Sequence, residues 1–248
     1  MTEENKQPEQ LLMFAKIAAT TYDNPKVSRA KFKALGYTIV EFFDTDGAQA
    51  YLLKGANGHV LSFRGTEVNE KSDILADLTA GKNLEACGGK VHVGFKGEIN
   101  KVWPAIEKAL VGIDTLYVTG HSLGAAMATI ASSRMQSKIT ALVTFGSPRT
   151  GNREFVNSLS VTHYRVQNNC DDVTKVPFKL MGFAHHGTHV YMNYYGEFRT
   201  LTTWQMIKDM FRSRLQARRK GQRFIGIFDH LIANYIAKLE KLGIKGSI

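Results

Sequence analysis

The stretch LYVTGHSLGAAMATIA, residues 116–131, decides the fold of this chain. Leu116 to Val118 are apolar and partly β-branched, as in a buried strand of a parallel sheet, and the alanine-rich run that follows favours a helix. Between them stands GHSLG, residues 120–124, a G-x-S-x-G pattern. Its glycines leave room for a sharp turn that presents Ser122, whereas a serine that merely caps the helix is the alternative. The strand-turn-helix setting favours a catalytic nucleophile at Ser122.

The composition bounds the class of protein. With 248 residues, of which 44% are hydrophobic, the chain can bury one sizeable core, so we expect a single α/β domain over residues 1–248. The N-terminal residues predict an amphipathic helix rather than a signal peptide, and no stretch approaches a membrane span. We therefore expect a cytoplasmic protein or one exported without a signal. Cys87 and Cys170 are expected to be free thiols, and no metal-ligand spacing is present, so no metal or cofactor is expected.

The charge is strongly positive and uneven. The formal net charge is +10, and residues 201–248 hold ten Lys and Arg against three acidic residues. Such a bias is typical of proteins that bind nucleic acid or an anionic membrane, or of a merely solvated surface. The chain has no helix-turn-helix, zinc-finger or aromatic-interleaved basic pattern, so no nucleic acid is expected.

The basic region near 202–223 is predicted to be helical and has an apolar side. Five apolar residues recur there at three- and four-residue spacing: Leu201, Trp204, Ile207, Phe211 and Leu215. Lys208, Arg212, Arg218 and Arg219 are expected largely away from that side. The preferred interpretation is that the apolar side docks on the protein and the charges are solvated. The alternative is that the segment lies at the rim of the active site and rests on anionic lipid.

Strands and helices are expected to alternate along the chain. We expect helices over 8–22, 94–112, 202–220 and 227–242, three short strands within 37–63, and later strands near 141–146, 161–166 and 188–195. This order predicts a mostly parallel central sheet with helices on both faces, an α/β-hydrolase arrangement around the serine turn.

A serine nucleophile needs a histidine that accepts its proton and a carboxylate that orients the histidine. In this arrangement they follow in the order Ser, Asp, His. Asp171 and Asp172 come directly after the strand 161–166, and one of them is the expected acid.

Four histidines are serious candidates for the base. His185, His186 and His189 precede or enter the strand 188–195, which places them opposite Ser122 if that strand is parallel to its neighbours. His230 follows the last strand and begins an amphipathic helix, so it is preferred.

The oxyanion of such a reaction needs two N–H donors. Leu123, directly after the nucleophile, supplies one. Thr66 ends an early strand and could supply its backbone N–H and its hydroxyl; its alternative role is to begin a helix over 68–77.

Several motifs together resemble the class 3 lipases, the family of the fungal triacylglycerol lipases and the plant plastid phospholipases A1. They are FRGTE (63–67), DILADLTA (73–80), KVHVGF (90–95), GHSLGAA (120–126), FGSPRTGN (145–152), RVQNNCDDVTKVP (165–177), FAHHGTHVY (183–191) and DHLIANYI (229–236). The resemblance implies an α/β-hydrolase fold, selects Asp171 over Asp172, supports His230, and makes residues 67–77 lid-like.

The chain also departs from the family pattern. Ile74 or Leu75 stands where family lids often carry tryptophan, and the lid-like segment is charged. The export signal and the multiple disulfides of the fungal members are missing. Neither strong interfacial activation nor extracellular fat digestion is therefore implied.

We thus expect a serine ester hydrolase that cleaves acyl lipids such as triacylglycerols through Ser122, His230 and Asp171, with transient contact to an anionic membrane or lipid surface. A phospholipase A1 and a short-chain carboxylesterase are the nearest alternatives. A non-catalytic, basic membrane-binding protein on a hydrolase scaffold is the alternative of another class.

Overall fold

A seven-stranded sheet forms the centre of the molecule. In the computed structural model, which describes residues 3–66, 82–85, 88–221 and 225–245, its strand order is β1-β2-β3-β6-β7-β8-β9. The strands are β1 Thr38–Thr45, β2 Ala48–Gly55, β3 Gly58–Phe63, β6 Leu116–His121, β7 Ile139–Phe145, β8 His163–Asn168 and β9 Thr188–Met192. Strands β1, β2 and β3 pair antiparallel, whereas β3, β6, β7, β8 and β9 run parallel to one another. The predicted mostly parallel sheet is confirmed. A separate pair is formed by β4 Lys82–Leu84 and β5 Lys90–His92.

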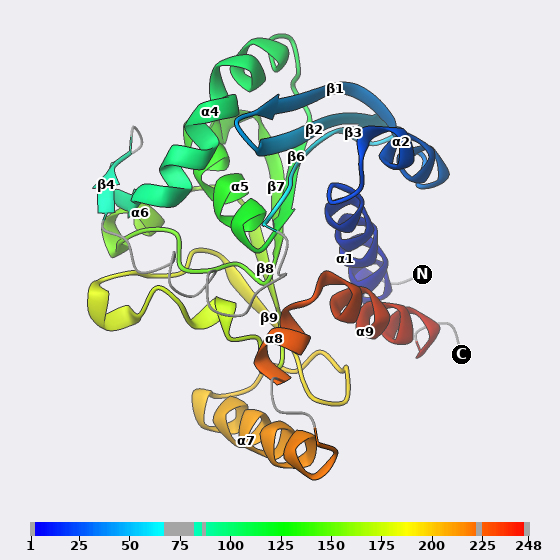
Figure 1. Cartoon of the computed structure of the whole chain (residues 1–248), viewed down its shortest axis with the longest axis vertical. Coiled ribbons are helices and arrows are strands. Elements are labelled where there is room, and N and C mark those ends of the chain that lie inside the picture. The colour runs from blue at the N-terminus through cyan, green and yellow to red at the C-terminus, as the bar shows by residue number, and fades with distance from the viewer. Residues whose placement is uncertain (1–2, 67–81, 86–87, 222–224, 246–248) are drawn as a thin grey trace.

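Helices cover both faces of this sheet. Helices α4 and α5 lie on one face, and α1 and α9 lie together on the other (Figure 1). The α-helices are α1 Glu3–Thr20, α2 Pro25–Ala34, α4 Val93–Ala109, α5 Leu123–Arg134, α6 Arg153–Ser158, α7 Thr203–Arg219, α8 Ile225–His230 and α9 Ile232–Lys245. Short 3₁₀ turns are η1 Gln136–Lys138, η2 Val173–Lys175 and η3 Lys179–Met181. Among the described residues, no helix is both long and apolar enough for a membrane span.

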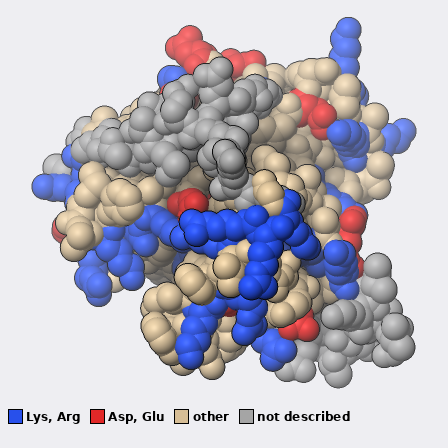
Figure 2. All heavy atoms as spheres, turned by 60° about the horizontal axis from the view of Figure 1, so that its bottom comes forward, with Lys and Arg blue, Asp and Glu red and all other residues tan. Residues whose placement is uncertain are grey.

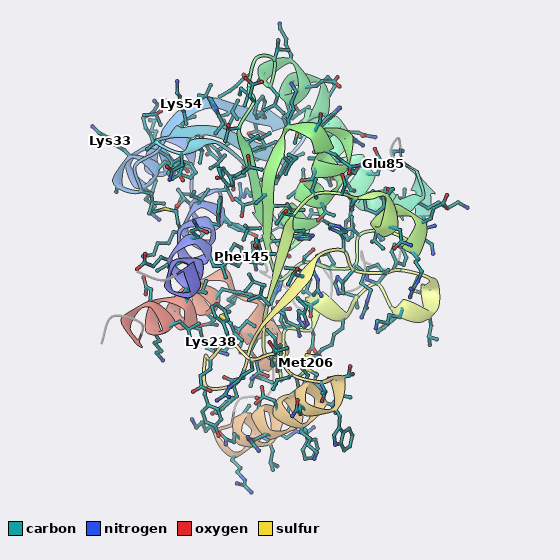
Figure 3. All side chains as sticks on the ribbon, turned by 180° about the vertical axis from the view of Figure 1, so that it is seen from behind. Lys33, Lys54, Glu85, Phe145, Met206 and Lys238 are labelled. Atoms are coloured by element: carbon teal, nitrogen blue, oxygen red, sulfur yellow. The ribbon has the colours of Figure 1, made fainter. Side chains whose placement is uncertain are left out.

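Each helical layer has its own core. Ile99, Val102 and Ile106 of α4 pack with the alanine-rich α5 against the sheet. On the other face, Phe145 of β7 lies at the middle of the sheet (Figure 3) and packs with Tyr235 of α9 and residues of α1. Burial on both faces explains why most successive residues of β6 and the end of β7 are buried, rather than alternate ones.

One expected helix at the C-terminal end of the chain differs from the structure. The helix expected over 227–242 is two helices, α8 and α9, which meet at Leu231. The break leaves His230 as the last residue of α8. The expected lid-like segment, 67–77, lies outside the described residues, as does Cys87, whereas Cys170 is a buried free thiol.

The prediction that the apolar side of the basic helix docks on the protein is wrong. Helix α7 projects from one end of the molecule (Figure 1), and its buried residues are Asp209, Ser213 and Ala217. The Asp209 carboxylate accepts hydrogen bonds from the Tyr191 hydroxyl at 2.9 Å and from a backbone N–H at 3.1 Å. Met206, on the side facing the body (Figure 3), is half-buried. Of the five apolar residues predicted to dock, four are exposed instead and Leu201, which precedes the helix, is half-buried. Buried hydrogen bonds therefore decide which side of α7 faces the body, and the apolar periodicity of the sequence does not predict them.

Gly124→Ala should destabilise the fold by at least about 2 kcal/mol and lower Tm by about 4–8 °C. A Cβ at this position would stand 2.3 Å from the Phe63 carbonyl oxygen, and backbone atoms on both sides of the contact cannot give way. Gly97→Ala is the matched control, because a Cβ there meets nothing within 4 Å and alanine favours helix α4. Calorimetry of the two variants checks this; equal Tm values would contradict the close approach at Gly124.

Candidate active site

Ser122 stands in a strained turn between β6 and α5. Its backbone has φ 59° and ψ −127°, a conformation that is costly for a residue with a side chain. The Ser122 N–H donates to the Phe145 carbonyl oxygen at 3.1 Å, which ties the turn to the neighbouring strand. Its hydroxyl makes no capping hydrogen bond to α5, every residue of which is described. The turn therefore presents this side chain rather than using it as a helix cap.

Glycines make this turn sterically feasible. A Cβ on Gly120 would lie 2.3 Å from the Gly124 carbonyl oxygen, and one on Gly65 would lie 2.5 Å from the His121 carbonyl oxygen. Backbone segments from β3, β6 and α5 thus approach one another more closely than side chains allow. The G-x-S-x-G pattern identifies two of these glycines, and the third belongs to the neighbouring strand end.

A buried hydrogen-bond chain runs from Ser122 to an acid. Ser122 Oγ lies 2.8 Å from His230 Nε2, and His230 Nδ1 lies 2.9 and 3.0 Å from the two Asp171 carboxylate oxygens. All three side chains are at most 1% exposed. Ser122 follows β6, Asp171 follows β8, and His230 ends α8, so the chain joins residues 108 and 59 positions apart.

The competing candidates lie elsewhere. Asp172 accepts hydrogen bonds from Lys175 at 2.6 Å and Arg214 at 2.8 Å near the surface. His185 Nε2–H donates to the Thr174 carbonyl oxygen at 2.8 Å. β9 is parallel to β8, as the topological argument required, so β9 begins at the end of the sheet opposite Ser122. His185, which precedes β9, is bonded to η2, and the contact to Ser122 is made by His230.

The two other histidines near β9 also have partners away from Ser122. His186 Nδ1 lies 3.1 Å from His163 Nδ1, and the two rings stack. His189 Nε2 lies 3.0 Å from the side-chain oxygen of Gln167.

Asp171 is charged although it is fully buried. Burial raises the pKa of this carboxyl group, but the neighbouring His230 and the Tyr235 hydroxyl more than offset this, so the pKa lies below its ordinary value. The Tyr235 hydroxyl donates to Asp171 Oδ2 at 2.5 Å, and the Val173 N–H donates to Oδ1 at 2.9 Å. Burial and the carboxylate raise the pKa of Tyr235 well above its ordinary value, so this hydroxyl remains a donor.

His121 holds the backbone of His230. His121 Nε2 lies 2.7 Å from the His230 carbonyl oxygen, which can only accept, so Nε2 carries the proton. Its Nδ1 then accepts from the Tyr22 hydroxyl of the turn after α1, at 2.8 Å. Burial and the neighbouring His230 lower the pKa of His121 to about 3, which keeps the ring neutral. The two imidazole rings lie 4.6 Å apart.

Sequence reasoning missed the roles of four supporting residues, Tyr22, His121, Gly146 and Tyr235. A Cβ on Gly146, which has φ 58°, would stand 2.9 Å from Asp171 Oδ2 and from His230 Nδ1. The sequence pattern places Tyr235 only on the apolar side of its helix. The one signal in the sequence is the Tyr235 hydroxyl itself, because a buried phenol O–H requires a hydrogen-bond acceptor.

Thr66 and Leu123 lie beside the turn. Leu123 is the first residue of α5, so its N–H belongs to the free N-terminal end of that helix. Thr66 is exposed and follows Gly65, and a Cβ on Gly65 would be 3.3 Å from Ser122 Cβ. The described residues contain no group of three or more His, Cys, Asp or Glu arranged to hold a metal ion.

Acid should destabilise the folded state because several histidines are buried in their neutral form. Burial lowers the pKa of His121 to about 3 and the pKa values of His163 and His185 well below 6.5. Below about pH 6.5 the unfolded chain binds protons at these sites and the folded chain does not. The free energy of unfolding therefore decreases as the pH is lowered. Asp229, whose pKa burial raises to about 6, opposes this.

We expect the free energy of unfolding to fall by about 2–4 kcal/mol per pH unit between pH 6 and pH 5. Urea titrations at pH 7, 6 and 5 measure this slope. A free energy that stays constant across the range would contradict neutral burial of the three histidines.

Comparisons with known proteins agree with the geometry. The family model Lipase (class 3) matches residues 60–181. The chain is 30% identical to a lipase of Rhizopus niveus over 217 residues, which span 73% of this chain and 53% of that protein. It is 37% identical to a secreted mono- and diacylglycerol lipase of Fusarium solani over 120 residues, 44% of this chain and 34% of that protein. The chain thus spans about half, or less, of the length of these relatives.

Solved structures share the fold. A Rhizomucor miehei lipase in complex with its propeptide superposes with a TM-score of 0.68 at 22% identity, covering 77% of this chain and 68% of that one. At this identity the likeness establishes the common architecture.

Proposed function

The chain belongs to the class 3 lipase family, and from this premise we propose that it is a serine ester hydrolase that cleaves the carboxylic ester bonds of acyl lipids. One observation carries the proposal: a strained turn presents Ser122 Oγ at 2.8 Å from His230 Nε2, and His230 in turn contacts a buried carboxylate. A helix-capping serine would require neither the strain nor the histidine.

The proposed reaction proceeds in two halves. Ser122 Oγ attacks the ester carbonyl carbon while His230 Nε2 takes the hydroxyl proton. His230 then gives that proton to the departing alcohol, which leaves an acyl group on Ser122. Water, deprotonated by His230, attacks this acyl-enzyme and releases the carboxylic acid and the free serine. No metal or cofactor takes part in these steps.

In this proposal Asp171 interacts with the general base, His230, rather than with the substrate. Its charge fixes the proton of neutral His230 on Nδ1, so that Nε2 is free to accept from Ser122, and it stabilises the imidazolium that forms. Tyr235 and Val173 fix the carboxylate, while His121 holds the backbone of the base. The relay is therefore oriented before substrate arrives.

We assign the oxyanion site to the N–H groups of Leu123 and Thr66, with the Thr66 hydroxyl as a further donor. Support comes from their places beside Ser122, at the start of α5 and one residue beyond Gly65. Donors aimed at the oxygen where charge develops stabilise the transition state more than the ground state.

Acylglycerols are the proposed substrates, because the Fusarium solani relative is a mono- and diacylglycerol lipase. Among acylglycerols, the resemblance of the sequence motifs to the fungal triacylglycerol lipases puts triacylglycerols first. Such lipids form separate phases in water, so the enzyme must meet them at a surface. The net charge of +10 supports transient contact with anionic membranes or lipid surfaces. Phospholipase A1 and short-chain esterase activities are distinguished by analysing products from mixed triacylglycerols and phospholipids.

Ser122→Ala should abolish activity while leaving the fold intact. Loss of the nucleophile should reduce kcat by several orders of magnitude on both a triacylglycerol emulsion and a soluble short-chain p-nitrophenyl ester. Circular dichroism serves as the folding control. More than about a tenth of the wild-type rate remaining would refute the nucleophile and favour a non-catalytic scaffold.

Neighbouring residues provide matched controls for the other two members of the relay. Asp171→Asn should lower kcat by about 10⁴-fold, because the amide disfavours the required histidine tautomer, whereas Asp172→Asn should remain within a few-fold of wild type. His230→Ala should be inactive, and His185→Ala should retain activity. Initial rates on the soluble ester decide this. An inactive His185→Ala beside an active His230→Ala would reverse the assignment.

A further inference from the structure

Helix α7 exposes the side that an amphipathic helix normally buries. Trp204, Ile207, Phe211 and Leu215 are 62%, 46%, 70% and 42% exposed. They lie three or four residues apart, so they form one stripe, here named the outer stripe, that runs for about 16 Å along the helix. A contiguous exposed apolar surface of this kind marks an interaction site.

The opposite side of α7 is committed to the protein through polar bonds. Asp209 accepts from Tyr191, and the Ser213 hydroxyl accepts from the Asn169 amide at 2.6 Å. Ala217 is buried further along the same side. These anchors hold the helix with its outer stripe facing away from the body, so the exposure follows from satisfied buried groups.

Basic residues border the outer stripe on both sides. At about 100° per residue, Lys208, Arg212 and Arg219 fall on one flank and Arg214 falls on the other, while Arg218 borders the end of the stripe beyond Leu215. All five are exposed. The Lys208 ammonium lies 5.2 Å from the centre of the Trp204 ring, directly beside the stripe. Figure 2 shows Lys and Arg side chains gathered in a band across this end of the molecule.

The charge of this helix is hardly compensated. Among residues 203–220 there are six Lys and Arg and one acid, Asp209, which is buried. Arg214 pairs with Asp172 at 2.8 Å. For the other five basic residues, no ion pair is formed with any acidic group that the structure describes. The helix therefore presents a strongly positive field around an apolar centre.

We propose that α7 is an interfacial helix that binds an anionic lipid bilayer. The outer stripe enters the boundary between headgroups and acyl chains, and the flanking Lys and Arg contact the negatively charged headgroups. Tryptophan, phenylalanine and leucine on one side, with basic residues around them, is the composition of helices that lie in a membrane surface. This inference rests on the proposed function in one respect: if the protein cleaves acyl lipids, binding through α7 brings the Ser122 end of the sheet to its lipid substrate.

Charge decides against a second copy of this chain as the occupant. Two such helices packed stripe to stripe would bring ten flanking positive charges together. An anionic bilayer neutralises the flanks and accepts the stripe at the same time.

Binding should be tested with vesicles of ether-linked lipids, which contain no ester to hydrolyse. The full chain should bind phosphatidylcholine vesicles that include phosphatidylglycerol and bind pure phosphatidylcholine weakly. Raising salt from about 0.01 M to about 0.15 M should weaken binding, because the screening length shortens from about 30 Å to about 8 Å. Absence of binding to the anionic vesicles at low salt overturns the inference.

The flanking charges are tested by Arg212→Glu/Arg218→Glu/Arg219→Glu. This variant should bind anionic vesicles at least about 100-fold more weakly, the effect expected from three basic residues at a charged surface. The matched control, Arg29→Glu/Lys33→Glu/Lys54→Glu, changes the net charge equally. Lys33 and Lys54 are exposed at the opposite end of the molecule from α7 (Figure 3). If both triple variants weaken vesicle binding equally, the effect follows from net charge alone, and the proposal that α7 forms a specific binding surface is overturned.

The outer stripe is tested by Phe211→Ser/Leu215→Ser against Val40→Ser/Val111→Ser, whose valines are exposed on other elements. The stripe variant should bind about tenfold or more weakly, and the control should match wild type. In a Trp103→Phe background, Trp204 emission should shift to the blue on anionic vesicles. Unshifted Trp204 emission overturns the proposal. A dimer in sedimentation that the stripe variant dissociates also overturns it, in favour of a contact between two copies of the chain.

Hydrolysis of a soluble short-chain ester separates this inference from the proposed function. Both α7 variants should retain wild-type rates on that substrate, which supports an interfacial role. Vesicle binding by a chain that hydrolyses no ester would support the interfacial helix and refute the enzyme. Ester hydrolysis without vesicle binding would refute the interfacial helix alone.

Discussion

The backbone at Ser122 is the constraint on which the rest of the structure depends. A residue with φ 59° and ψ −127° must be held in place, and the hydrogen bond from its N–H to Phe145 does this from the neighbouring strand. The close approaches at Gly65, Gly120 and Gly124 bring the end of β3 against the same turn. Parallel pairing of β3, β6 and β7 is thus required for the turn as well as for the core.

The helices across the sheet from α5, α1 and α9, serve this turn as well as their own core. Tyr22, just after α1, reaches His121, and Tyr235 of α9 reaches Asp171. A fully buried carboxylate is stable only when donors replace its lost hydration, and here a histidine, a phenol and a backbone N–H do so. The α1 and α9 layer therefore preorganises the relay, which a purely aliphatic core would not do.

What the sequence predicts well is what local chemistry determines. The serine turn, the parallel sheet and the choice of His230 follow from residue types and strand direction. Tyr235 and His121 were not predicted to position the relay, because their hydrogen bonds join residues 64 and 109 positions apart. Residue chemistry does not separate Asp171 from Asp172, which are neighbours in a loop. The resemblance to the class 3 lipases selects Asp171, and in the structure Asp171 is the one that contacts His230. The lid-like segment at 67–77 lies outside the described residues.

Helix α7 shows why apolar periodicity reports a side but not its direction. The periodicity of Trp204, Ile207, Phe211 and Leu215 is helical, yet Asp209 and Ser213 contact the body instead. Reversing the helix would bury a stripe worth about 1.5–3 kcal/mol per large side chain, but would strand the Tyr191 hydroxyl and Asn169 without these partners. A protein that forgoes such burial in water recovers it only where another apolar phase meets the helix. Under the proposed function, that phase is the lipid surface that holds the substrate, and the basic flanks of α7 favour an anionic surface.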